Sequence, residues 1–121
     1  MIHVSYSSLF QCDLESVTDW LYSFAINNGK NPNRIVEDFK QELTHQVVLI
    51  QQNPFIKPAY GLNNPTRRAV LFFGNFILEY QIIPTGSKFK NLVTEVILTA
   101  LVPSRSGKYG GAFEDLENFE F

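Results

Sequence analysis

The sequence contains a single cysteine and no long hydrophobic run, and these two absences limit the kind of protein it encodes. Cys12 alone cannot form an intramolecular disulfide, which is typical of proteins from reducing compartments. No apolar run approaches the ~20 residues of a membrane span, and no charged segment leads into an apolar one as in a secretory signal. We therefore expect a cytoplasmic protein with no membrane association. Cys12 falls within a helical apolar pattern, so we expect it to be half-buried.

The sequence also has no strong excess of either charge and no metal-binding pattern. The formal net charge is −2, which argues against a dedicated nucleic-acid binder, because affinity for nucleic acid depends largely on Lys and Arg. His3 and His45 have no Cys, His or Asp cluster beside them at metal spacing, so we expect no metal and no cofactor. The charge is nevertheless uneven along the chain. Residues 66–112 contain Arg67, Arg68, Lys88, Lys90, Arg105 and Lys108 against Glu79 and Glu95.

What the chain does have is enough apolar material for one aromatic-rich core. It has 121 residues, 45% of them hydrophobic and 18% charged, with eleven phenylalanines. This composition is typical of one folded globular domain. We assign that domain to residues 1–112. Residues 113–121 alternate aromatic and acidic side chains and form a separate C-terminal tail.

The first half of the chain predicts one strand and two helices. Residues 2–6 alternate as a strand does, and apolar residues then recur at helical spacing from Leu9 to about Asn28. Gly29 suits the left-handed position just past a helix end. Asn31 and Pro32 suit the N-cap and first turn of a second helix, which Asn53-Pro54 ends. So short a link between the two helices predicts an antiparallel helical hairpin.

The second half predicts strands. Residues 66–83 place the pair Gly74-Asn75 between two apolar runs, which indicates a hairpin with a two-residue loop. Residues 54–65 are expected to be a loop, residues 84–87 a turn, and residues 92–102 a central strand. The order is β-α-α-β-β-β. We therefore predict an α+β fold in which the helical hairpin packs on a small, mainly antiparallel sheet.

This order and several of its residues resemble the RelE/ParE superfamily, the toxin components of bacterial type II toxin–antitoxin systems. The resemblance covers residues 2–109. It rests on the paired helices, on Arg67 and Arg68 opening a strand, and on the alternating segment 74–82. It also rests on the last strand being followed by Arg105 and Tyr109. It implies a cognate antitoxin bound in a hetero-oligomer.

The resemblance leaves three functions open. A RelE-like, ribosome-dependent mRNA endoribonuclease would use Arg68, Arg105, Lys108 and Tyr109, with cations stabilising charge on the phosphate. However, Ile77 stands where many of these nucleases have an arginine, and no histidine follows the last strand. A ParE-like toxin, which binds DNA gyrase and needs no catalytic set, is therefore favoured. The third alternative is a non-toxic binding module on the same scaffold.

The resemblance and the strand pattern also indicate binding residues. We expect Arg67, Arg68, Tyr80 and Arg105 to contact the antitoxin or the target. Because side chains alternate along a strand, Arg67 and Arg68 are expected to point to opposite faces of the sheet. The helical hairpin and the C-terminal segment are the expected gyrase-binding surface.

Overall fold

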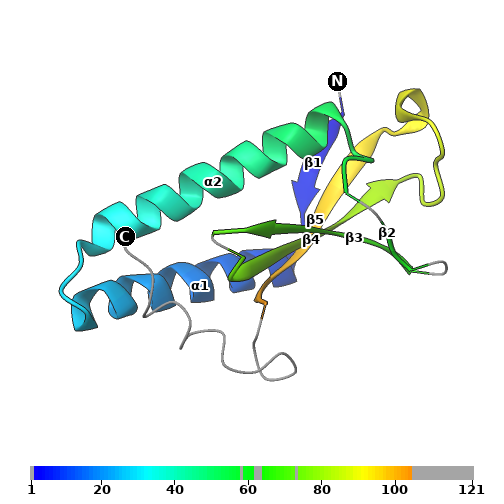
Figure 1. Cartoon of the computed structure of the whole chain (residues 1–121). Coiled ribbons are helices and arrows are strands. Elements are labelled where there is room, and N and C mark those ends of the chain that lie inside the picture. Colours follow the sequence, from blue (N-terminus) through cyan, green and yellow to red (C-terminus); the bar gives the residue numbers. More distant parts are fainter. Residues whose placement is uncertain (1, 58, 62–63, 73, 105–121) are drawn as a thin grey trace.

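Two antiparallel helices pack against one face of a mixed sheet (Figure 1). The computed structural model describes residues 2–57, 59–61, 64–72 and 74–104. Within these residues the sheet has five strands in the order β1-β5-β4-β3-β2. The predicted α+β class and the predicted order of helices and main strands are confirmed.

The two helices begin and end close to the predicted residues. Helix α1 spans Ser8–Asn27, and Ser7 caps it by accepting a hydrogen bond from the Phe10 amide. Gly29 follows with φ of +68°. Helix α2 spans Pro32–Gln52 and ends directly before Asn53.

Cys12 is exposed, so its predicted half-burial is wrong. Cys12 follows Phe10 by two residues, which is about half a helical turn. It therefore lies on the side of α1 opposite the buried row Phe10, Val17 and Leu21.

The start of α2 provides a test of local stability. The Asn31 side chain accepts hydrogen bonds from the amides of Asn33 (3.1 Å) and Arg34 (3.2 Å), which have no partner inside the helix. Replacing Asn31 with alanine is expected to lower the free energy of unfolding by about 0.5–2 kcal/mol. Urea denaturation measures this change. Asn33→Ala, within the first turn, is the control and should change stability by less than about 0.5 kcal/mol.

The strands form one sheet with a parallel edge. Strand β1 (His3–Tyr6) pairs in parallel with β5 (Glu95–Pro103). Strands β5, β4 (Phe76–Ile83), β3 (Asn64–Leu71) and β2 (Ala59–Gly61) then pair antiparallel in turn. The central strands β4 and β5 have an irregularity between Glu79 and Tyr80. On β5, Leu101 follows this irregularity, and its amide donates a hydrogen bond to the Asp13 carboxylate of α1 (3.0 Å). This bond ties α1 to β5.

Three local predictions are corrected. The predicted loop 54–65 contains the short strand β2 and the start of β3, whose backbones pair. Strand β2 was missed because so short a strand has no clear sequence pattern. The hairpin loop has four residues, 72–75, because Leu71 pairs with Phe76. Strand β5 starts at Glu95 instead of residue 92, since Lys90–Leu92 form a 3₁₀ turn.

The core lies between the helices and the inner face of the sheet. Phe39 of α2 has its ring centroid 5.4 Å from that of Phe72 and 5.3 Å from that of Phe76, with near-perpendicular planes. Phe72 has φ of +54°, and its amide donates a hydrogen bond to the Glu42 carboxylate. Left-handed backbone is costly for a large side chain, so burial of the ring and the bond to α2 hold this conformation. The turn between β3 and β4 is thereby fixed to α2.

Candidate functional site

Arg67 and Arg68 lie on opposite faces of β3, as predicted. Arg67 shares the inner side with buried Ala69 and Leu71. Its guanidinium donates to the Lys57 carbonyl and lies 5.1 Å from the centroid of the Phe55 ring. These contacts hold the residues after α2 against β3. Arg67 therefore has a structural role at this edge, and one partner segment cannot reach both arginines from the same side.

Arg68 lies on the outer face of the sheet, opposite Glu79 of β4. The Arg68 Nε atom is 3.4 Å from the Glu79 carboxylate, and each side chain is about a quarter exposed, 24% and 25%. The two residues are direct partners across the antiparallel strands. A half-buried pair of this kind offsets the charge of Arg68 within the chain itself.

The outer face carries rows of side chains that cross the strands. Beside the Arg68–Glu79 row, Val70 pairs with Ile77, which pairs with Val102. Val70 is 55% exposed, whereas Ile77 is only 7% exposed. On the other side, the Gln81 amide donates to the Thr66 hydroxyl (3.4 Å). We define the open face as these three rows, completed by Ala100 and Ile97. The open face thus combines an apolar row, an ion pair and a polar row.

Further along the same outer side, β5 meets β1. Glu95 accepts a hydrogen bond from the Ser5 hydroxyl, and exposed His3 is the strand partner of Glu95. The Glu95 carboxylate is therefore engaged by a neighbouring hydroxyl. These residues extend the polar character of the outer side towards the β1 edge.

Tyr80 is on the inner side of β4 and is fully buried. Its hydroxyl donates to the Pro54 carbonyl at 3.0 Å. Burial raises the pKa of Tyr80 above its ordinary value of 10.0, while the charge of Arg67 and a backbone hydrogen bond from Lys57 lower it in part. A partner on the sheet surface does not reach this side chain, so we do not include Tyr80 in the candidate site.

The raised pKa of Tyr80 predicts how stability depends on pH. Above pH 10 the unfolded chain loses the phenolic proton while the folded protein keeps it, so folding is favoured less. The stabilisation is fully present below pH 10 and declines as the pH rises from there through the folded pKa. Tyr80→Phe should therefore show a shallower loss of stability above pH 10 than the wild type, measured by urea denaturation at several pH values. An equal slope in both proteins would contradict the prediction.

The remaining predicted site residues, Arg105, Lys108 and Tyr109, lie outside the described residues, as does the tail 113–121. Among the predicted site residues that are described, Arg68 is on the open face, whereas Arg67 and Tyr80 are not. Sequence reasoning missed two members of the site, Glu79 as the partner of Arg68 and Val70 as an exposed apolar residue. Val70 could have been found from strand alternation, because it is two residues from Arg68 and must share its face.

Two further observations concern the described residues. No three His, Cys, Asp or Glu side chains among them are grouped so that they could hold a metal ion. Neither helix in that part of the chain has the length and apolar character needed to cross a bilayer.

A search against models of protein families and a search of curated proteins each found no match for this chain.

Proposed function

We propose that the chain is the toxin component of a bacterial toxin–antitoxin system, acting in the cytoplasm by binding DNA gyrase and neutralised by a cognate antitoxin. The observation that carries the choice of a binding mechanism over a nuclease mechanism is the Arg68–Glu79 ion pair on the open face. The sequence resemblance to the RelE/ParE superfamily supplies the class of toxin. The confirmed order of helices and main strands is consistent with that class.

The charge on the open face supports binding to a protein. Cleavage of RNA needs positive charge near the scissile phosphate, where negative charge develops. Arg68 is the only Lys or Arg that the described strand residues contribute to the outer side, and Glu79 offsets its charge. A phosphate placed there would also meet the Glu79 carboxylate.

The apolar row supports the same choice. Val70 is more than half exposed and Val102 is partly exposed, while Ile77 between them is buried. Protein interfaces combine an apolar centre with a polar rim, and Arg is enriched in them. The Val70 row with the Arg68–Glu79 pair beside it has this character. We therefore assign target binding to the open face instead of the helical hairpin and the C-terminal segment that the sequence indicated.

Induced expression in a bacterial host tests the function. Growth, DNA synthesis and protein synthesis would be followed by label incorporation, and purified protein would be tested for inhibition of gyrase supercoiling. We expect growth arrest in which DNA synthesis fails first. Val70→Asp should relieve the arrest, because it places a charge in the apolar row. Ile56→Asp, at an exposed apolar residue after α2, is the matched control and should leave the arrest unchanged.

Each other outcome argues against the proposal. Early loss of protein synthesis with cleaved mRNA would establish the nuclease instead. No arrest from soluble, folded protein would leave the non-toxic binding module. Equal relief by both variants would show that the open face is not the target-binding surface.

A further inference from the structure

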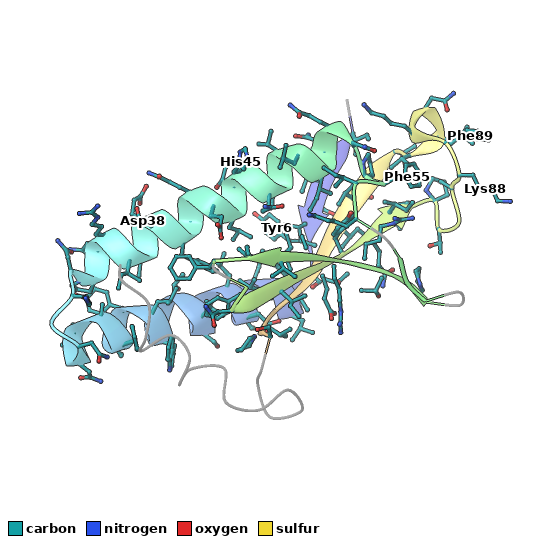
Figure 2. The ribbon with its side chains drawn as sticks, in the orientation of Figure 1. Tyr6, Asp38, His45, Phe55, Lys88 and Phe89 are labelled. Atoms are coloured by element: carbon teal, nitrogen blue, oxygen red, sulfur yellow. The ribbon has the colours of Figure 1, made fainter. Side chains whose placement is uncertain are left out.

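A second surface, separate from the open face, lies at the opposite end of the molecule from the turn that joins the helices. It is a groove of about 1010 Å³ between the end of α2, the start of β1 and the residues that precede β5. Figure 2 shows Lys88 and Phe89 at this end, on the connection between β4 and β5. The lining includes Ile2, Val48, Gln52, Phe89 and Val93. None of these residues belongs to the Arg68–Glu79 row or the Val70 row.

The groove and its rim expose large apolar side chains. Phe89 is 64% exposed, and Val48 on the facing helix is 40% exposed. Leu92, at the end of the 3₁₀ turn, is 53% exposed next to the lining residues Asn91 and Val93 but does not itself line the groove. Neighbouring exposed apolar side chains around a hollow are typical of surfaces that bind another molecule. Phe89 is suited to act as an anchor because its backbone is fixed by the hydrogen bond from the Leu92 amide to its carbonyl (3.0 Å).

The charges at the rim indicate the character of the partner. Exposed Lys88 and Lys90 lie on either side of Phe89, and Lys90 also lines the groove. The nearest carboxylate along the chain, Glu95, is engaged by the Ser5 hydroxyl. The rim is therefore basic. A second copy of this chain placed groove to groove would bring lysines towards lysines, which argues against self-association there.

Nucleic acid also fits this surface less well than protein. Tight binding to a phosphate backbone uses several cations, whereas Lys90 is, among the described residues, the one lysine that lines this groove and Lys88 is the next lysine along the chain. An extended or helical protein segment buries apolar side chains in such a groove while its own acidic residues meet the rim. Charge complementarity thus favours an acidic protein segment.

We propose that this groove binds a segment of a partner protein that carries large apolar side chains flanked by Asp or Glu. Phe89 and Val48 contact the apolar side chains, and Lys88 and Lys90 pair with the carboxylates. The inference does not depend on the proposed toxin function, because it rests on different residues on a different surface.

A phage-displayed library of random peptides, panned on the full chain, tests the proposal without a known partner. Binding of the enriched peptides would be measured by fluorescence anisotropy against the wild type and against Phe89→Ser and Lys88→Glu/Lys90→Glu. We expect acidic peptides with aromatic or aliphatic residues, which each variant binds about tenfold or more weakly. Added salt should also weaken binding. Ile26→Ser, at an exposed residue of α1, is the matched control and should bind them as the wild type does.

Thermal unfolding followed by circular dichroism would show that each variant remains folded, which is expected because the substituted side chains are exposed. Failure to enrich any peptide, peptides without acidic residues, or equal binding to Phe89→Ser would each overturn the proposal. A single-stranded 12-nucleotide RNA that binds more tightly than the peptides and depends on Phe89 would also overturn it in favour of nucleic acid. Val70→Asp should leave peptide binding intact, which separates this result from the test of the toxin function.

Discussion

Replacing Phe39 with alanine is expected to lower the free energy of unfolding by about 3–5 kcal/mol, the largest effect of any single substitution considered for this chain. Phe39 is fully buried and packs edge-on against both Phe72 and Phe76. Truncation removes these contacts and leaves a cavity between α2 and the sheet, which relaxation of the two elements does not fully close. Because Phe72 holds the 72–75 loop in place, loss of its partner also loosens that loop. Urea denaturation followed by circular dichroism measures the change.

The matched control for Phe39→Ala is Tyr22→Ala on α1, where the side chain is 43% exposed. This variant also replaces an aromatic residue in a helix with alanine, so helix propensity acts in a similar way in both. Its stability should change by less than about 1 kcal/mol. A loss below about 1 kcal/mol in Phe39→Ala would show that α2 does not pack on the turn between β3 and β4 as described.

The ends of the helices could be predicted from the sequence because they depend on nearby residues. Asn31 caps α2 through two amides within three residues, and Gly29 adopts the left-handed backbone that follows α1. Asn53-Pro54 ends α2 through a steric effect between neighbours. In each case the structure is determined by residues close together in the chain. The order of helices and strands follows from such local signals and from hydrophobic periodicity.

The hairpin loop could not be predicted because it depends on contacts from outside the hairpin. Gly74-Asn75 alone indicates a two-residue loop, which would place Arg68 opposite Gln81. In the structure the loop has four residues because Phe72 turns inward onto Phe39, while its amide bonds to Glu42 of α2. The register moves by two residues, so every side chain keeps its face. Arg68 now lies opposite Glu79.

This shift determines how the candidate site is interpreted. From the sequence alone, Arg68 is a cation available to bind phosphate, and Glu79 is a neighbouring acid of the wrong sign. With the observed register the two residues form an ion pair. The alternation of Arg67 and Arg68 could be predicted, since it follows from strand geometry. The partner of Arg68 could not, since it is determined by residues of α2 far away in the sequence.

Reversing one charge of this pair should destabilise the fold, and reversing both should restore it. Arg68→Glu places two carboxylates opposite each other and is expected to lower the free energy of unfolding by about 1–3 kcal/mol, between the values for exposed and for buried pairs. Glu79→Arg should have a similar cost. The double variant Arg68→Glu/Glu79→Arg should recover most of the loss, since it rebuilds the pair in the opposite direction. Urea denaturation of the four proteins gives the coupling between the two residues, and additive costs would show that they do not interact.

The same double variant separates the two mechanisms when it is expressed in a bacterial host. For a nuclease, the exchange moves the cation from β3 to β4 and places a carboxylate at position 68, so the phosphate site loses its geometry and growth arrest should be lost even though the fold is restored. For a gyrase-binding toxin, the apolar row of Val70, Ile77 and Val102 is unchanged and the neighbouring pair still has no net charge. Growth arrest should then persist and be lost in Val70→Asp. The proposed binding mechanism would be contradicted if Arg68→Glu/Glu79→Arg abolished growth arrest while Val70→Asp still caused it. Both variants keep a folded sheet, and they differ in which row of the open face they change.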